Sequence, residues 1–372
     1  MVGLPGPEHP RQDRSRGIHA AGRLLSTARL AAVGAVFLLV VALFVGYLLR
    51  GGEDAEPLPG SPLRELAKAR GMELGTAVRG DALERVRAYR QTVAAQFSTV
   101  TPENEMKWSA IEPERGGFEF AAADDIVERA REARQKVRGH TLVWHAQLPD
   151  WVRELGAREL RQATREHIRT VMRHYRDDVG AWDVVNEPIS DGGRLRRSVF
   201  MRRLGEGFIE DAFRTARAAD RDAKLYLNEI GAEGINAKSN RLYEIVRDLK
   251  SAGVPIDGVG FQVHANLNGL PADFVQNMQR FRALGLDVAI TEADVGIPMP
   301  PNAAKLEAQA AIYREIVRSC RAVDCRSLTF WGFTDGRSWI SETQAGMGAA
   351  TLLDEDLRPK PAFRAVQRAL GG

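Results

Sequence analysis

The sequence predicts an α/β fold of the (β/α)8 TIM-barrel type, preceded by one N-terminal transmembrane helix. Three observations lead to this prediction. About 310 residues follow the N-terminal segment, which suits one large barrel. From Pro62 onward, short apolar runs alternate with amphipathic helical patterns. Polar and aromatic residues gather where these runs end, as they do at the carboxyl ends of barrel strands.

The first element is the apolar segment Leu30–Leu49, twenty residues without a charge. As a helix it spans ~30 Å, the thickness of a bilayer core. The alternatives are a buried helix and a cleaved signal peptide, but both are usually shorter, and no small-residue cleavage pattern follows. We therefore expect an uncleaved single-pass membrane anchor.

The orientation of this anchor follows from the flanking charges. Five arginines precede the span and only Arg50 follows it, so the positive-inside rule places residues 1–29 in the cytoplasm as a basic tail. Residues 50–61 read as a linker. Residues 62–372 then form a folded domain outside the cytoplasm, in a periplasm or at the cell surface.

Charge and cysteine content limit the partners. The net charge is +3, but residues 1–50 carry +4 and the rest −1, so the folded domain has no basic excess and a nucleic-acid partner is not expected. No ligand set with metal spacing appears, and we expect neither a metal nor a cofactor. Cys320 and Cys325 are either free thiols or one small-loop disulfide, and an extracytoplasmic location favours the disulfide.

Eight apolar runs are expected as strands, and the amphipathic stretches between them as helices. A doubly wound open sheet is the alternative, but no glycine-rich phosphate motif follows the first strand. The expected strands are Glu73–Val78, Ala95–Thr101, Lys136–Trp144, Ala181–Asn186, Lys224–Asn228, Gly258–Val263, Asp287–Thr291 and Ser327–Gly332. The expected helices include Ala122–Arg134, Glu159–Arg176, Ser198–Ala218, Asn240–Ala252 and Ala304–Ala322.

Two further residue assignments follow from these periodicities. Trp182 points opposite Asp183 on its strand, which favours a place in the core. His167 and His174 lie two turns apart on one helix face. We interpret them as a solvated or partly buried face rather than metal ligands.

The polar clusters at the strand ends predict glycosidic cleavage. Two glutamates, Glu187 and Glu292, follow different strands, and such a pair supplies one protonated acid and one ionised carboxylate. Asn186 places an amide beside Glu187, where it can bind a sugar 2-hydroxyl. Tryptophans offer flat apolar faces to sugar rings. Spacing alone leaves open whether the reaction retains or inverts the anomeric configuration.

The same motifs resemble those of glycoside hydrolase family 10, the endo-β-1,4-xylanases. The resemblance covers residue 62 to the end of the chain. It rests on six motifs in the family's order: Thr101–Trp108, Arg138–His145, Trp182–Pro188, Gly260–His264, Ile290–Val295, and Trp331-Gly332 with Asp335 and Ser338-Trp339. The ending Lys360-Pro361-Ala362-Phe363 is also similar.

The resemblance implies a retaining endo-β-1,4-xylanase acting by double displacement, with Glu187 as acid/base and Glu292 as nucleophile. It implies that His264 and Asp294 form a hydrogen-bonded chain with Glu292 that sets its charge. Family members often join two cysteines just before the eighth strand, where Cys320 and Cys325 fall. The implied substrate-binding residues are Glu103, Asn104, Lys107, His140, Trp144, Gln147, Asn186, Gln262, His264, Trp331 and Trp339.

One strand end departs from the family pattern. The usual Asn-Asp-Tyr-Asn reads Asn228-Glu229-Ile230-Gly231 here, so the tyrosine that packs near the departing sugars is replaced. The remaining function hypotheses are a glycosidase of this fold acting on another β-linked, exported polysaccharide, and a non-catalytic sugar-binding barrel. For the glycosidase we expect a bell-shaped pH–rate profile and a monomeric catalytic domain.

Overall fold

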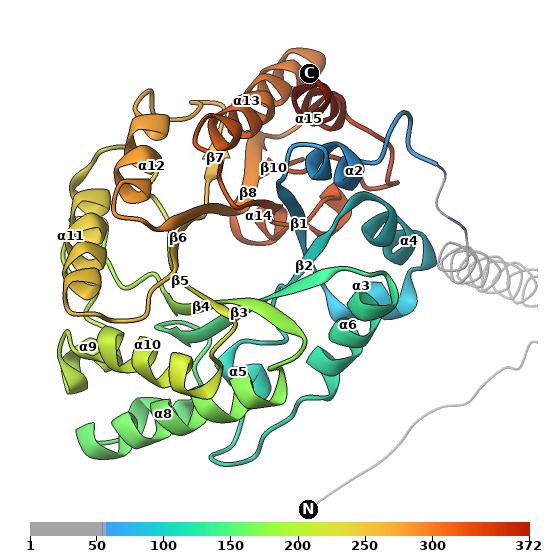
Figure 1. Ribbon diagram of the computed structural model, residues 1–372. Coiled ribbons are helices and arrows are strands. Elements are labelled where there is room, and N and C mark those ends of the chain that lie inside the picture. The colour runs from blue at the N-terminus through green and yellow to red at the C-terminus, as the bar shows by residue number, and fades with distance from the viewer. Residues whose placement is uncertain (1–53, 55–56) are drawn as a thin grey trace, which may run out of the picture. The chain divides into compact units, whose positions relative to one another are not determined.

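Eight parallel strands form a closed barrel in the part of the chain that the structure describes. This structure is a computed structural model that describes residue 54 and residues 57–372. The strands follow the order β8-β6-β5-β4-β3-β2-β1-β9, and the pairing of β8 with β9 closes the ring. Figure 1 shows the helices surrounding the strands. The barrel strands are β1 (Glu73–Val78), β2 (Thr99–Pro102), β3 (Lys136–Trp144), β4 (Val179–Asn186), β5 (Lys224–Glu229), β6 (Gly258–Phe261), β8 (Asp287–Pro298) and β9 (Ser327–Phe330).

The predicted (β/α)8 barrel is therefore confirmed, and its strand boundaries largely agree. The strands expected at Glu73–Val78 and Lys136–Trp144 have the predicted bounds. The strand expected at Ala95–Thr101 is wrong at its start, because the preceding helix continues through Gln96. The strand expected at Gly258–Val263 ends at Phe261, and the short strand β7 (His264–Asn266) resumes beside β8. A second short strand, β10 (Met347–Gly348), is antiparallel to β8.

The helices cover the outside of the barrel. Most predicted helices appear within a few residues of their expected bounds. The helix predicted at Ser198–Ala218 is wrong as a single element, because the chain leaves helical geometry at Gly205, whose φ is 70°. The helices are α2 (Leu63–Lys68), α3 (Gly80–Arg85), α4 (Arg87–Gln96), α5 (Trp108–Ile111), α6 (Ala121–Glu132), α7 (Asp150–Glu154), α8 (Ala157–His174), α9 (Val199–Leu204), α10 (Phe208–Ala219), α11 (Ala237–Ser251), α12 (Phe274–Arg282), α13 (Ala303–Ala322), the 3₁₀ turn η1 (Asp335–Arg337), α14 (Trp339–Thr343) and α15 (Pro361–Gly371).

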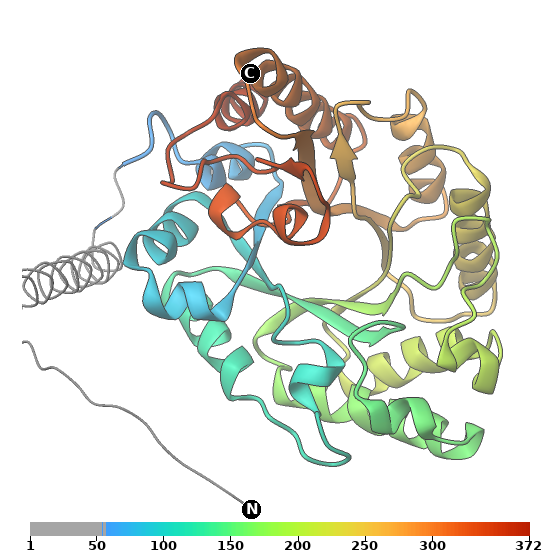
Figure 2. The same cartoon turned by 180° about the vertical axis from the view of Figure 1, so that it is seen from behind.

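The two ends of the barrel sequence meet. Helix α15 lies beside α2 in both views (Figures 1 and 2). Arg70, which follows α2, donates a 3.0 Å hydrogen bond from Nε to the carbonyl oxygen of Leu370 in α15. This contact ties the first helix of the barrel to the last.

Trp182 belongs to the core, as the strand alternation predicted. Its side chain is fully buried. Gly139 on the neighbouring strand faces the indole, and a Cβ atom there would lie 2.1 Å from Trp182 Cε3. A larger residue at position 139 would collide with the indole ring. Glycine is therefore required there for β3 to pair with β4 while Trp182 keeps its place in the core.

The prediction for the two helix histidines is correct only in part. His174 is partly exposed and pairs with Asp124 at 2.8 Å. His167 is fully buried, so its assignment to a solvated or partly buried face is wrong. Its Nδ1 lies 3.0 Å from Glu112 Oε2, and its ring stacks on Trp108 with centroids 4.0 Å apart. The hydrogen bond to Glu112 offsets part of the cost of burying the imidazole.

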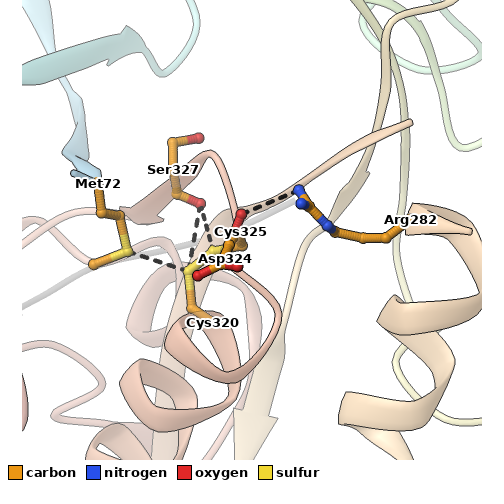
Figure 3. The surroundings of a disulfide bond; sticks show 6 residues. All are labelled: Met72, Arg282, Cys320, Asp324, Cys325 and Ser327. Atoms are coloured by element: carbon orange, nitrogen blue, oxygen red, sulfur yellow. Dashed lines mark hydrogen bonds between the residues drawn. A yellow bond between two sulfur atoms is a disulfide. The ribbon is translucent and has the colours of Figure 1, made fainter. Parts of the chain in front are cut away.

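Cys320 and Cys325 form a disulfide, which confirms the predicted pairing. It links the last turn of α13 to the segment before β9 (Figure 3). Cys320 Sγ lies 3.3 Å from Met72 Sδ, and Arg282 donates to the carbonyl oxygen of Asp324 at 3.2 Å. The bridge thus fixes a turn at the end of the barrel where the strands begin.

The predicted anchor Leu30–Leu49, the tail 1–29 and half of the linker 50–61 lie outside the described residues. Within residue 54 and residues 57–372, no helix has the length and apolar character that a membrane crossing requires. Asp54, in the linker, pairs with Arg87 of α4 at 2.8 Å.

Candidate active site

The predicted acid/base Glu187 directly follows β4, and its backbone is unusual. Its φ is 51°, a left-handed conformation that is uncommon for non-glycine residues and is often found at active sites. The amide of Glu187 donates to the carbonyl oxygen of Asn228 at 2.9 Å. Its carboxylate accepts a 3.1 Å hydrogen bond from Gln262 Nε2 and lies 3.5 Å from Asn186 Nδ2. His145 approaches from the other side, with Nδ1 3.9 Å from Oε2.

The predicted nucleophile Glu292 lies at an irregularity of β8. The pairing of β8 with β9 shifts register between Ile290 and Ala293, so the strand carries an extra residue where Glu292 stands. The side chain is buried, and its Oε1 accepts a 2.7 Å hydrogen bond from Asn228 Nδ2. Oε2 lies 3.2 Å from His264 Nε2. Burial by itself would raise the pKa of Glu292, but the hydrogen bond from His264 and the nearby imidazoles outweigh it and lower the pKa.

A chain of ion pairs and hydrogen bonds continues from Glu292. His264 Nδ1 lies 3.0 Å from Asp294 Oδ2, and Trp339 Nε1 donates to the same oxygen at 2.7 Å. Burial opposes the charged form of His264, yet Asp294 and Glu292 overcome it and raise the pKa of this imidazole to about 10. His264 therefore carries a positive charge between two carboxylates, and the structure brings together the three residues predicted for this chain.

The two predicted carboxylates are connected through amide side chains. Gln262 Nε2 bridges Glu187 Oε1 and Asn186 Oδ1, at 3.1 and 3.2 Å. Asn228 Nδ2 bridges Asn186 Oδ1 and Glu292 Oε1, at 2.9 and 2.7 Å. The relative positions of the two carboxylates are thus fixed by residues from four adjacent strands or strand ends.

A buried ion pair lies beneath the site. Arg138 Nη2 contacts Asp183 Oδ1 at 2.5 Å, and His140 Nδ1 lies 3.0 Å from Asp183 Oδ2. Burial would raise the pKa of Asp183, but the charge of Arg138 and the hydrogen bonds lower it. His140, predicted to line the substrate site, is itself only 2% exposed, and its Nδ1 is 3.9 Å from Glu292 Oε1.

A second polar cluster follows β2 and contains four of the predicted sugar-binding residues. Asn104 Oδ1 accepts hydrogen bonds of 3.2 Å from both Lys107 Nζ and Gln147 Nε2. Lys107 Nζ also lies 4.9 Å from the Trp144 ring centroid. Burial raises the pKa of Glu103 to about 7 and lowers that of Lys107.

The predicted cleft tryptophans lie next to the histidines of the site. Trp331 is mostly buried, with its ring centroid 5.1 Å from that of His140. Trp339 is half-buried and lies 4.8 Å from the ring of His264. The indole faces and the paired carboxylates therefore border the same region.

Several residues that complete the site were not among the predicted ones. Asn228 and Asp183 appeared only as parts of strand-end motifs and were given no role in the site. Glu229 is completely buried at the end of β5, where it accepts from the Ile189 amide at 3.0 Å and pairs with Lys238 at 3.2 Å. Burial raises the pKa of Glu229 to about 8. Position at a strand end was the one available signal for Asn228 and Glu229.

No group of three or more potential ligand residues with metal-site geometry occurs within the described residues.

Comparison with known proteins gives a consistent result. Residues 62–369 match the sequence profile of glycosyl hydrolase family 10. The chain is 42% identical over 275 residues to an endo-1,4-beta-xylanase of Agaricus bisporus, covering 73% of this chain and 83% of that protein. It is 40% identical over 316 residues to endo-1,4-beta-xylanase B of Thermotoga neapolitana, covering 83% and 91%. The crystal structure of xylanase 10B from Thermotoga petrophila RKU-1 in complex with xylobiose superposes with a TM-score of 0.82 at 41% identity, covering 85% of this chain and 98% of that one.

Proposed function

Because the chain belongs to glycosyl hydrolase family 10, we propose that it is an endo-1,4-β-xylanase that hydrolyses internal β-1,4-xylosidic bonds with retention of configuration. Two relatives that share 42% and 40% sequence identity with this chain, over most of their own length, are named endo-1,4-beta-xylanases. The related structure with bound xylobiose supports a xylan-type substrate.

The observation that carries this proposal is the linked pair Glu187 and Glu292. Glu292 is kept ionised by His264, and Glu187 accepts a hydrogen bond from the neutral amide of Gln262 in the same site. Glycoside hydrolysis by two carboxylates needs this division into an ionised nucleophile and a proton donor.

In the first step, Glu292 Oε attacks the anomeric carbon while Glu187 donates its proton to the glycosidic oxygen. The bond from the anomeric carbon to that oxygen breaks, the leaving chain departs with a free hydroxyl group, and a glycosyl ester of Glu292 forms. Asn228 and His264 hold the attacking carboxylate in one orientation. Asn186 would bind the 2-hydroxyl, an interaction that strengthens in the transition state.

In the second step, the now ionised Glu187 removes a proton from water, and the water oxygen attacks the anomeric carbon. The ester bond to Glu292 breaks, so both carboxylates return to their starting states and the configuration is retained. The cluster Glu103, Asn104, Lys107 and Gln147 would hold the sugars on the non-reducing side of the cut, with Trp144, Trp331 and Trp339 as apolar walls.

The test is hydrolysis of xylan by the full-length protein in detergent, compared with Glu187→Ala and Glu292→Ala. We expect activity in the parent and its loss in both variants. NMR of the first products should show the β-anomer before mutarotation. Azide should restore turnover of an activated aryl xylobioside by Glu187→Ala and yield a β-glycosyl azide. Parent activity on another β-linked polymer but not on xylan would overturn the substrate, and binding without any hydrolysis would favour a sugar-binding barrel.

The location of the domain is a separate part of the proposal. Residues 30–49 would anchor the chain in a membrane, with residues 1–29 in the cytoplasm, a linker at residues 50–61 and the catalytic domain (62–372) outside. The charge asymmetry around the apolar segment supports this orientation, and a structural disulfide fits an oxidising compartment. Protease added to intact cells or spheroplasts should degrade the catalytic domain, and alkaline carbonate should leave the protein in the membrane fraction. Release of the protein by carbonate would contradict the anchor.

A further inference from the structure

Val263 has a backbone conformation that its side chain disfavours. Its φ is +65°, in the left-handed region, and a β-branched residue is a true outlier there. The side chain of Val263 is buried, so contacts within the protein and not with solvent determine its conformation. Such a conformation persists only when surrounding contacts impose it.

The contact that imposes it comes from Glu233, in the segment between β5 and α11. Glu233 Oε1 accepts a 2.9 Å hydrogen bond from the amide of Val263. The backbone under Glu233 is itself fixed, because Asn277 of α12 donates Nδ2 to the carbonyl oxygens of Ala232 and Glu233, at 2.7 and 2.8 Å. Asn277 is completely buried, so this support is rigid.

The position of Val263 matters because both of its neighbours contact the catalytic carboxylates. Gln262 precedes it and donates to Glu187 at 3.1 Å. His264 follows it and lies 3.2 Å from Glu292. The orientation of both side chains therefore depends on the backbone at one residue.

The register of the sheet shows why a turn is needed there. Phe261 pairs with Ile290, and His264 pairs with Asp294. The β6–β7 segment therefore advances by three residues where β8 advances by four. The left-handed residue lies within this mismatch, opposite the part of β8 that carries the nucleophile.

We infer that Glu233 is a positioning residue, whose carboxylate holds Val263 in the left-handed conformation and thereby aligns Gln262 with the acid/base and His264 with the nucleophile. The inference rests on the proposed glycosidase function. In this role Glu233 does not contact the substrate. Its effect passes through the backbone of Val263.

The first experiment compares Glu233→Asp with Glu233→Gln in the full-length protein. Aspartate keeps the carboxyl group but is one methylene too short to reach the amide of Val263, whereas glutamine keeps the reach and an acceptor oxygen. We expect kcat on xylan to fall about 10-fold or more in Glu233→Asp, the cost of losing the conformational restraint. Glu233→Gln should retain at least about a third of parental kcat, because the side-chain oxygen of glutamine can accept the same hydrogen bond from the amide of Val263. The reverse order would overturn the inference.

The second experiment asks whether the backbone carries the effect. Glycine adopts positive φ without steric cost, so Val263→Gly should restore part of the activity that Glu233→Ala loses. Val263→Ala in the same background is the matched control, because it removes the same branched side chain but keeps the cost of positive φ. Equal activity of these two double variants would show that no restraint on φ is involved.

Two readouts separate positioning from mere stability. In Glu233→Ala the acid limb of the kcat/KM profile should move to higher pH, because His264 no longer lies against Glu292, and the crystal structure should show a negative φ at Val263. A lower melting temperature with unchanged kcat and pH profile would contradict the inference. Absence of xylanase activity in the parent protein would instead reject the proposed function, so the two failures are distinguishable.

Discussion

Asn228 Nδ2 donates a 2.7 Å hydrogen bond to Glu292 Oε1, from the end of β5 to the bulged residue of β8. A flipped amide would place Asn228 Oδ1 against the oxygens of Glu292 and Asn186, and it would lose the 2.7 Å hydrogen bond that Thr291 Oγ1 donates to Oδ1. The second proton of Nδ2 is directed toward Asn186 Oδ1 at 2.9 Å. Each atom of this buried amide group thus has a defined partner, and the nucleophile inherits a defined orientation.

Asn228→Ala should lower kcat about 10- to 100-fold, because a hydrogen bond to a charged group contributes about 1.5–3 kcal/mol. Thr291→Val is the matched variant: it leaves the amide in place but removes the contact that orients it, and we expect a smaller loss. The measurement is kcat and KM on an aryl xylobioside. If Thr291→Val were the more damaging of the two, the orienting role of the hydroxyl would be misassigned.

His264→Gln should move the acid limb of the kcat/KM profile to higher pH. In the parent, the positive charge of His264 favours the ionised form of Glu292 and lowers its pKa. Since the pKa of His264 is about 10, this charge persists through the whole acid and neutral range. Its removal raises the pKa of Glu292, so the nucleophile is protonated, and activity lost, at a higher pH than in the parent.

The control for this prediction is Trp339→Phe, which removes the indole hydrogen bond to Asp294 but keeps His264 and its charge beside Glu292. Its acid limb should move less than that of His264→Gln. An acid limb that stays at the parental pH in His264→Gln would show that Glu292 does not set it.

The success of the strand predictions and their failures have physical causes. The end of β1 was predictable because its run of small and apolar residues stops at the charged Arg79. Strand β3 also contains Arg138 and His140, so its bounds did not follow from hydrophobicity alone. The start of β2 was not predictable, because Ala95 and Gln96 belong to the last turn of α4, and one helical turn cannot be told from a strand by hydrophobicity alone. The break after Leu204 depends on the positive φ of Gly205, which a single glycine in a helical pattern does not reveal.

In the site, too, residues with a local sequence signal were predicted, and residues that depend on tertiary contacts were not. Glu187 and Glu292 stood out as carboxylates at strand ends, and the linked chain through His264 followed from the family resemblance. The supporting residues did not stand out, because the contact of Asn228 with Glu292 spans 64 positions and depends on the closed barrel. The positive φ of Val263 likewise results from tertiary contacts and has no signature in a valine.

Arg138→Met should destabilise the protein by about 3–5 kcal/mol, since removal of one partner leaves the buried carboxylate of Asp183 without its main counter-charge. Both side chains are at most 4% exposed, so water cannot replace the lost partner. For a domain of this size the melting temperature should fall by roughly 5–10 °C. Thermal unfolding of the two proteins at pH 7 tests this expectation.

The pH dependence supplies the check. The pKa of Asp183 is lowered in the folded protein, so the ion pair contributes stability above the unfolded-state pKa of about 4, and this contribution disappears as the pH falls through the folded-state value. The difference in stability between parent and Arg138→Met should therefore shrink in strong acid. A difference independent of pH would assign the loss to packing of the arginine side chain.

Ile230→Tyr should tighten binding of the departing sugars. Ile230 directly follows β5 and is half-buried. It stands where the family resemblance implies a tyrosine near the departing sugars. A ring contact contributes about 0.5–1.5 kcal/mol, so KM for xylohexaose should fall roughly 2- to 10-fold. Ile230→Leu preserves the apolar volume without a ring and should leave KM near the parental value. Cleavage of an aryl xylobioside, whose leaving group is not a sugar, should respond little to either variant. An equal gain on both substrates would place residue 230 outside the leaving-group side, because only xylohexaose has sugars there to be bound.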